Sequence, residues 1–374
     1  MNTLNKKKYK MKAICGLILV FLTVNSYSQN EDFNIIIMNP ATNVKNQMGS
    51  GQYCWSYATC SFLESELIRS GKSVYDLSED YFIYHAYIDK AENYVLRKGY
   101  ARFYKGGLAH DVLRIVKEKG AIPDPFYKID YIRNNNEPED VLFSYLNTIL
   151  KEEYLTENWM KHYLALLDSY FADRIDQFKL NDSAFTPKTF VKYIGINVDD
   201  YVSITSFTHH PFNTNFILEI PDNYANGSYF NIPLNDFIQI VDTCLIKGYT
   251  LVWDGCIEGR GFSYNDGLAM EPVYSNYKDL VLEPDINEHD IDQQKRQIAF
   301  ERLQTTDDHL MHIIGIAESV KGKKFYIVKD SGGEYGPYNG YLYMSEAFFK
   351  MKTLAITLNK NAIPESIKIM MSEK

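Results

Sequence analysis

A cysteine stands at the predicted start of a helix, behind a glycine-rich stretch. Residues 46–56 read NQMGSGQYCWS, with Gln47 upstream of Cys54. A helix N-terminus carries about half a positive charge, which stabilises a thiolate, and the thiolate is the nucleophilic form of cysteine. The Gln47 amide and the Cys54 backbone N–H can stabilise a developing oxyanion. These residues point to nucleophilic catalysis, with a buried, unreactive cysteine as the competing interpretation.

Two histidines near the C-terminal end offer a general base for such a thiol. His309 and His312 lie in the segment DDHLMHIIG, at the predicted start of a strand. Their offset of three places them on opposite faces of that strand, so one can face the thiol and the other cannot. Asp330 ends the next predicted strand and can accept a hydrogen bond from the imidazole. We therefore consider a Cys–His–Asp set.

Other groupings predict no further chemistry. The histidine pair 309–312 beside the acidic pair 307–308 lacks an HExxH helix, and a strand separates its two members, so we expect no metal. No glycine-rich phosphate loop follows a predicted strand, so we expect no cofactor. His209-His210 precedes a proline in a predicted loop and is interpreted as a structural pair.

The cysteines that follow Cys54 in the chain are interpreted as packing residues. Cys60 lies six residues after Cys54 on the same predicted helix and should point away from the reacting group. Cys244 and Cys256 flank a predicted helix and strand. A disulfide between them stays open, with buried free thiols as the default.

Composition limits the class of protein. The chain has 374 residues, a net charge of −9, 45% hydrophobic and 23% charged residues. These values are typical of two globular domains, or one large domain with insertions. An acidic chain is a poor nucleic-acid binder, since phosphates select for clustered Lys and Arg. The 30 tyrosines suit peptide or sugar contact, and equally packing.

Residues 1–28 have the pattern of a secretory signal. Five lysines between positions 6 and 12 precede the apolar run 13–24, and the small-x-small site at 26–28 predicts cleavage before Gln29. The run is shorter than the roughly 20 residues that span a bilayer. We expect an exported protein, periplasmic or secreted, with no stable membrane association after signal removal. A retained anchor is the competing interpretation.

The order of predicted elements indicates an α+β fold with two lobes. Apolar spacing and capping residues predict helices over 54–70, over 79–96 with Ser78 as the N-cap, and over 110–119. Residues 137–180 are helical in pattern. Strands and helices then mix, with strands at 202–207, 216–220, 250–254, 312–319, 324–330 and 340–344, and helices at 233–247 and 287–303.

Several motifs resemble the papain superfamily, and within it the bleomycin hydrolase/aminopeptidase C branch. They are NQ…CW around Cys54, LSE at 77–79, the pair Gly106-Gly107, TTDDH at 305–309 and KNAIPESIK at 360–368. In the superfamily pattern the catalytic histidine lies six residues before a glycine. His309 and Gly315 satisfy that spacing, so His309 is chosen over His312.

The resemblance implies a papain-like two-lobed fold with a helical insertion. A helical left lobe carrying the nucleophile helix would occupy 29–136, the insertion 137–200, the strand-rich right lobe 201–358 and a C-terminal arm 359–374. In this branch the arm is implied to lie in the cleft and to restrict attack to peptide N-termini.

The resemblance also implies an activity and its residues. It implies a thiol aminopeptidase that hydrolyses small peptides through an acyl-enzyme. Cys54 would attack, His309 would transfer the proton, Asp330 would orient His309, and Gln47 would help to hold the oxyanion. Gly106 and Gly107 would contact the substrate backbone. Peptides would be the partners, and the chain would self-associate, as a hexamer in relatives.

Three departures from the family pattern are expected to weaken the chemistry. Asp330 stands where the family has Asn, which should raise the pKa of His309. Gly332 stands where the family has Trp, so the Asp330–His309 bond should be less shielded. Gln47 lies seven residues before Cys54 where six are expected. The alternatives are a catalytically weakened peptide-binding relative and, more weakly supported, another Cys–His acyl transferase.

Overall fold

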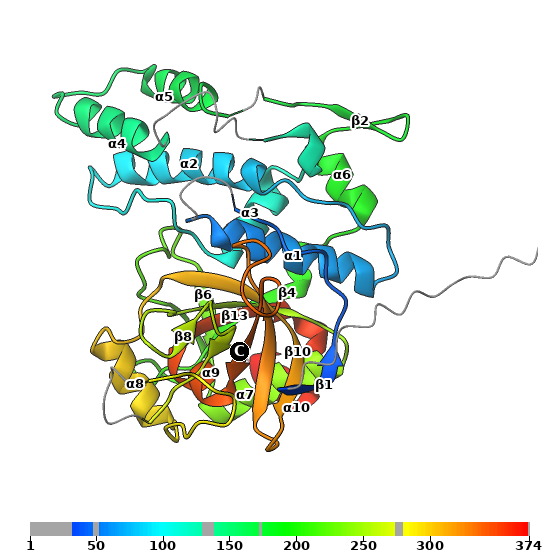
Figure 1. The fold of residues 1–374 in the computed structure, drawn as a ribbon. Helices are drawn as coiled ribbons and strands as arrows, with labels where there is room; N and C mark the ends of the chain where they lie inside the picture. Colours follow the sequence, from blue (N-terminus) through cyan, green and yellow to red (C-terminus); the bar gives the residue numbers. More distant parts are fainter. Residues whose placement is uncertain (1–31, 48–51, 129–137, 172–173, 274–279, 373–374) are drawn as a thin grey trace, which may run out of the picture.

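The computed structural model describes residues 32–47, 52–128, 138–171, 174–273 and 280–372. The predicted signal 1–28 and the glycine-rich stretch 48–51 lie outside the described residues. Figure 1 shows helices of the first half of the chain lying over a large sheet built mainly from the second half. Helices and one large sheet confirm the predicted α+β class.

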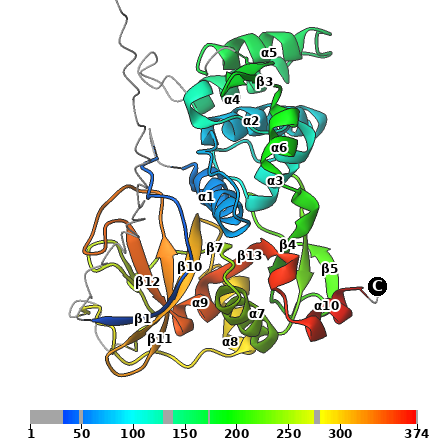
Figure 2. The same cartoon turned by 90° about the vertical axis from the view of Figure 1, so that its right-hand side faces the viewer.

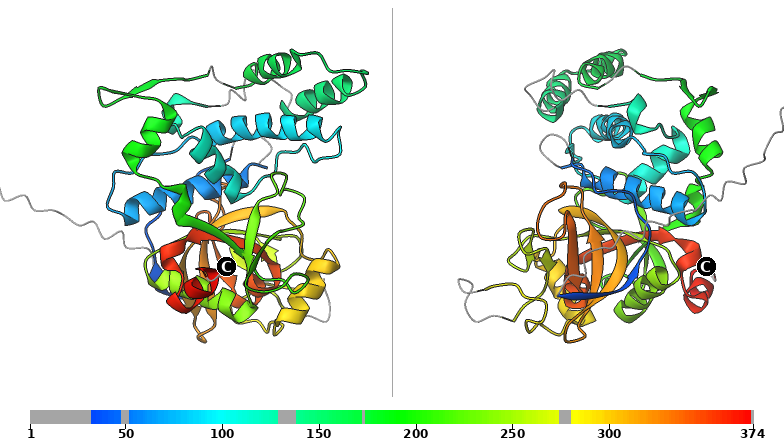
Figure 3. Two further views of the ribbon diagram at one scale, coloured as in Figure 1. Left: turned by 180° about the vertical axis from the view of Figure 1, so that it is seen from behind. Right: turned by 45° about the vertical axis from the view of Figure 1, so that its right-hand side comes forward.

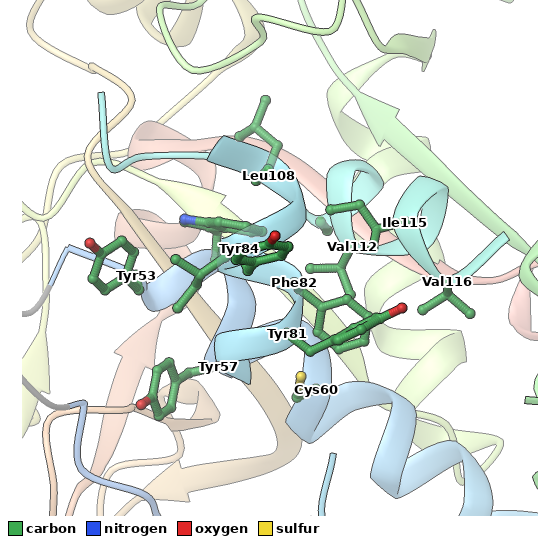
Figure 4. Close-up of a cluster of buried hydrophobic side chains, with 14 of the residues drawn as sticks. Tyr53, Tyr57, Cys60, Tyr81, Phe82, Tyr84, Leu108, Val112, Ile115 and Val116 are labelled. Atoms are coloured by element: carbon green, nitrogen blue, oxygen red, sulfur yellow. The ribbon is translucent and has the colours of Figure 1, made fainter. Parts of the chain in front are cut away.

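Three helices form the layer next to the sheet: α1 (Cys54–Arg69), α2 (Glu79–Leu96) and α3 (Ala109–Glu118). The observed ends of all three helices agree with the predicted ends within one residue. The Ser78 hydroxyl accepts a hydrogen bond from the backbone N–H of Tyr81, which caps α2 as predicted. Figure 4 shows how Phe82 of α2 and Val112 of α3 enter the core that these helices share.

Helix α1 is buried on all sides, which its sequence did not indicate. Every residue from Cys54 to Leu67 is buried. Glu64 and Glu66 interrupt the apolar pattern of this helix, yet they are only 1% and 5% exposed. The reason is position, because α1 lies between the other helices and the sheet (Figures 1 and 2). Leu77 N–H and Thr42 Oγ1 donate hydrogen bonds to the Glu64 carboxylate.

A second set of elements lies on the outer side of α2, as the two views of Figure 3 also show. These elements fall within the predicted insertion 137–200. They are α4 (Pro138–Ile149), α5 (Trp159–Asp168), the hairpin of β2 (Phe178–Leu180) and β3 (Ser183–Phe185), and α6 (Pro187–Ile194). The proposed division of the chain into lobes, insertion and arm stays a prediction.

Among the described residues, eleven strands form one sheet in the order β5-β6-β4-β13-β7-β10-β11-β12-β9-β8, with β1 paired to β10. The strands are β1 (Phe33–Met38), β4 (Tyr201–Thr205), β5 (Thr214–Ile217), β6 (Ser228–Asn231), β7 (Leu251–Gly255), β8 (Phe262–Ser263), β9 (Leu268–Ala269), β10 (His309–Ser319), β11 (Lys324–Lys329), β12 (Tyr341–Ser345) and β13 (Thr353–Asn359). Each predicted strand overlaps an observed one, although β5 covers only the first part of 216–220, and β1, β6, β8, β9 and β13 were missed.

The second half also contributes helices α7 (Leu234–Ile246), α8 (Gln293–Glu301), α9 (Glu346–Lys352) and α10 (Glu365–Ser372). Short 3-10 turns occur at η1 (Asp124–Phe126), η2 (Val198–Asp200) and η4 (Lys360–Ala362). Apolar residues of α7 and α9 pack with β7, β10 and β11 in a second core. The described residues contain no helix with the length and apolar character needed to cross a membrane.

Strand β10 connects the sheet to α1. It pairs with β7 and β11, and its first residue, His309, lies opposite Gly255. Leu310 of β10 and Val252 of β7 belong to the same core as α1. The start of β10 therefore lies beneath the helix that begins at Cys54.

The tail does not lie where the resemblance implied. Strand β13 begins opposite Gly255 and ends at Asn359, whose side-chain amide donates to the Glu66 carboxylate at 2.6 Å. Glu66 lies twelve residues along α1 from Cys54, roughly 18 Å away. Ile363 and Ile367 belong to the same core as the apolar residues of α7, and Figure 2 shows α10 next to α7. For residues 360–372 the predicted position in the cleft is therefore wrong, because their apolar face packs on α7.

The buried tail generates a stability prediction. Ile367 is 1% exposed, so Ile367→Ala should lower the free energy of unfolding by about 2–5 kcal/mol in urea titrations. Ile369→Ala is the matched control, because Ile369 lies on the same helix and is 50% exposed. Equal effects of the two substitutions would contradict this packing.

Candidate active site

The structure brings Cys54, His309 and Asp330 together. Cys54 begins α1, His309 begins β10, and Asp330 directly follows β11. His309 Nε2 lies 2.8 Å from Asp330 Oδ1. The charge of Cys54 acts on the same ring and raises its pKa, so the two side chains are neighbours. Because Nε2 contacts Asp330, Nδ1 is the nitrogen left to exchange a proton with the sulfur. The imidazole thus lies between a thiol and a carboxylate, as a proton-transfer group requires.

Charge and burial act in opposite directions on His309. Burial favours the neutral ring, but the negative charges of Asp330 and Cys54 and the hydrogen bonds to both hold the pKa of His309 well above its usual value. Burial would likewise raise the pKa of Asp330, yet the charge of His309 and its hydrogen bond hold it below its usual value. The expected effect of Asp in place of Asn on the imidazole is confirmed in direction.

A backbone amide adds a contact that the sequence did not predict. The N–H of Leu310 points at Cys54 Sγ, with an N···S distance of 3.4 Å. No acidic residue lies in the first turn of α1, so the helix dipole acts on the sulfur without a competing carboxylate in that turn. Both features place positive electrostatic potential at the sulfur.

Tyr335 covers Asp330, which corrects the expected exposure at Gly332. The Tyr335 hydroxyl donates to Asp330 Oδ2, and its ring lies so close to Gly332 that a Cβ there would come within 2.7 Å of it. Asp330 is 4% exposed. The aromatic cover comes from a residue three positions along the loop, which motif comparison at position 332 alone cannot find.

Gln47 lies next to this group but makes other hydrogen bonds. Its amide oxygen accepts from the backbone N–H of Tyr53 at 3.1 Å, and its amide nitrogen donates to Ser331 Oγ. The backbone N–H of Gln47 also donates to the Ser331 carbonyl. The role of Gln47 at the oxyanion stays a prediction.

Gly106 and Gly107 lie beside the residue that follows Cys54. A Cβ on Gly107 would come within 2.9 Å of the Trp55 ring, and one on Gly106 would overlap Asp222. The Trp55 indole N–H donates to the Lys105 carbonyl at 3.0 Å. Close packing against the Trp55 ring therefore favours glycine at 107, whereas a side chain at 106 would have to displace the Asp222 carboxylate. Contact of either glycine with substrate stays a prediction.

The other histidines and cysteines lie apart from this chemistry. His312 is fully buried, and its Nδ1 contacts Ser61 Oγ at 2.8 Å, so only His309 meets the thiol. Cys60, Cys244 and Cys256 are buried free thiols, as the default interpretation held. His209 and His210 both contact the carboxylate of Glu219, which agrees with a structural pair.

The fold and the Cys–His–Asp arrangement define a papain-like cysteine peptidase. The Peptidase C1-like family matches residues 165–374, more than half of the chain, and the chain belongs to this family. Its relatives place it in the bleomycin hydrolase/aminopeptidase C branch of the papain superfamily, as the motifs indicated.

The similar proteins include several named aminopeptidases. Aminopeptidase C of Streptococcus thermophilus is 25% identical, covering 92% of this chain and 86% of its own. Aminopeptidase G of Lactobacillus delbrueckii subsp. lactis is 21% identical, covering 89% of this chain and 84% of its own. Mouse bleomycin hydrolase is 25% identical, covering 44% of this chain and 36% of its own. The crystal structure of PepW from Lactobacillus rhamnosis HN001 matches 90% of this chain and 84% of its own, with a TM-score of 0.72 at 18% identity. This match confirms the fold.

The charge on Asp330 should appear in the pH dependence of hydrolysis. Asp330→Asn keeps a hydrogen-bond acceptor but removes the charge that raises the pKa of His309, so the imidazolium should lose its proton at lower pH. The alkaline limb of the kcat/KM profile should move down by about one pH unit. Asp199→Asn, which removes an exposed carboxylate paired with Lys117, should leave the limb in place. An unmoved limb in Asp330→Asn would show that this charge does not act on His309.

Proposed function

We propose that this cysteine peptidase is an exported aminopeptidase that hydrolyses small peptides through an acyl-enzyme on Cys54. The observation that carries the proposal is the His309 ring, which is hydrogen-bonded to Asp330 and close enough to Cys54 for the two side chains to interact electrostatically. This arrangement supplies the nucleophile and the proton donor that amide cleavage needs.

The steps follow from the placement of these groups. The Cys54 thiolate attacks the scissile carbonyl carbon, and the oxygen gains the negative charge. The first N–H groups of a helix have no intrahelical acceptor, so the Cys54 N–H is available to that oxygen. The His309 imidazolium then gives its proton to the leaving amine as the C–N bond breaks, which leaves a thioester. Neutral His309 takes a proton from water, whose oxygen attacks the thioester and releases the acid and the thiolate.

The preference for peptide N-termini is supported by the relatives. Two proteins named aminopeptidase match nearly the whole chain. The arm that the resemblance implied is not supplied by residues 360–372, because those residues pack on α7. Recognition of the substrate amine therefore requires another group in this chain.

Export is proposed from the predicted signal at 1–28 alone. N-terminal sequencing of the protein recovered from the periplasm or medium of its native host should begin at Gln29. Recovery only with the cytoplasmic fraction and an intact leader would refute export and leave the peptidase chemistry unaffected.

Removal of the nucleophile tests the mechanism. Cys54→Ala should reduce hydrolysis of leucyl-aminomethylcoumarin by at least about 10⁴-fold, with an unchanged circular dichroism spectrum. Cys60→Ala is the matched control, because Cys60 is a buried thiol on the same helix without a place in the mechanism. Full activity in Cys54→Ala would remove Cys54 from the reaction.

A peptide-binding relative with weakened chemistry is the second candidate. The observation that favours it is the Gln47 amide, which is held by Ser331. An enzyme should alkylate at Cys54 with a peptidyl chloromethylketone much faster in the folded than in the unfolded state. Equal rates would favour the binding protein.

A further inference from the structure

A buried carboxylate without a partner lies opposite the nucleophile. Asp254 of β7 pairs directly with Leu310 of β10, the residue whose N–H contacts Cys54 Sγ. Paired residues on adjacent antiparallel strands project to the same face of a sheet, so Asp254 lies on the face that Leu310 presents to α1. Asp254 is 5% exposed, and neither carboxylate oxygen has a hydrogen-bond partner among the described residues.

Two further carboxylates adjoin Asp254. Asp307 Oδ2 accepts a hydrogen bond from the Asp222 N–H at 2.9 Å, whereas Asp307 Oδ1 is buried without a partner in the described part of the chain. Asp222 lies against Gly106 and pairs with Arg102 at 3.4 Å. We call Asp222, Asp254 and Asp307 the carboxylate trio. Burial and the charge of Asp222 raise the pKa of Asp307 to about 7, and burial with the charges of Asp307 and Asp222 raises that of Asp254.

Burying a carboxylate without a hydrogen-bond partner costs free energy. The neighbouring Asp308 shows how a structural carboxylate is stabilised in this chain. Asp308 receives hydrogen bonds from the backbone N–H groups of Ile257 and Glu258. Asp254 receives none in the described residues. The nearby cations do not pair with Asp254, since Arg102 pairs with Asp222 of the trio and the Lys90 ammonium donates to two backbone carbonyls.

The trio suits an ammonium group better than a bare metal ion. A metal ion needs ligand atoms that converge closely. Among the described residues, two groups have ligand atoms within 4.8 Å of one another, Glu64-Asp76-Glu79 and His209-His210-Glu219. The trio is not one of these groups. A primary ammonium has three N–H donors pointing in different directions and can reach separated oxygens. Asp222 and Asp307 are partly exposed to solvent.

We propose that the carboxylate trio binds a primary ammonium of the substrate on the acyl side of the scissile bond, with Asp254 as its main acceptor. This inference rests on the proposed peptidase function. Two sources have this chemistry: the α-amine of the residue that is cleaved off, and the ε-amine of a lysine one residue upstream. With the α-amine as ligand, the trio would select peptide N-termini in place of the implied C-terminal arm.

The test compares substrates that differ only in an amine. Asp254→Asn should lower kcat/KM for leucyl-aminomethylcoumarin at least about 30-fold, with no loss on the N-acetylated substrate. If the ε-amine is the ligand, the loss should appear on acetyl-lysyl-leucyl-aminomethylcoumarin and not on its acetyl-leucyl-leucyl counterpart. Asp199→Asn is the control for losing one carboxylate far from Cys54. Equal loss on all substrates, or no loss on any, would overturn the proposal.

A second measurement separates this site from the hydrolytic function. Leucinamide should slow alkylation of wild-type Cys54 by iodoacetamide, N-acetyl-leucinamide should not, and Asp254→Asn should lose the protection. This readout needs no turnover, so it can support the site even if hydrolysis fails. Protection that survives in Asp254→Asn, or that both amides give, would refute the site.

A stability measurement distinguishes a binding residue from a structural one. Asp254→Asn removes an unpartnered buried charge, so its melting temperature should equal or exceed that of the wild type, more so at pH 8 than at pH 4. The sign follows because a raised carboxylate pKa in the folded state makes the protein lose stability as pH rises. A clear drop in melting temperature would assign Asp254 a structural role. Asp307→Asn provides a second variant for the substrate comparison.

Discussion

The chemistry of this protein depends on one buried imidazole held between two negative groups. Cys54, His309 and Asp330 come from the start of a helix and from two neighbouring strands, and burial strengthens the electrostatic interactions among them. Burial alone would lower the pKa of His309, and the charges of Asp330 and Cys54 raise it above its usual value. Every larger feature of the fold that matters for function serves to keep α1 against the start of β10.

The buried charged groups near α1 differ in whether they have a hydrogen-bond or ion-pair partner. Behind the nucleophile, Glu64 accepts two hydrogen bonds, and the Lys45 ammonium lies close to Glu79, so these buried groups are paired. Beside the nucleophile, Asp254 has no such partner among the described residues. Paired charges hold the helix in place, while an unpaired one is stable only when something else supplies the opposite charge. This contrast is the physical basis for assigning Asp254 to substrate.

The chain retains the papain-like arrangement while replacing some of its parts. Tyr335 provides the cover over Asp330 that Gly332 lacks, so the His309–Asp330 bond is shielded by a different residue. Residues 360–372 pack on α7, so an end preference has to come from another part of the molecule. A fold similarity at 18% identity is compatible with such exchanges, because the backbone arrangement tolerates them as long as the imidazole keeps its neighbours.

The sequence alone determined the features that depend on local spacing. Ser78 and the apolar pattern set the start of α2, and the six-residue spacing from His309 to Gly315 selected His309 over His312. Only the tertiary structure decided which side chains meet across long separations. The burial of Glu64, the cover by Tyr335 and the placement of Asp254 all depend on strand register and helix packing. A linear pattern does not contain that information, because each of these side chains acquires its surroundings from elements far away in the chain.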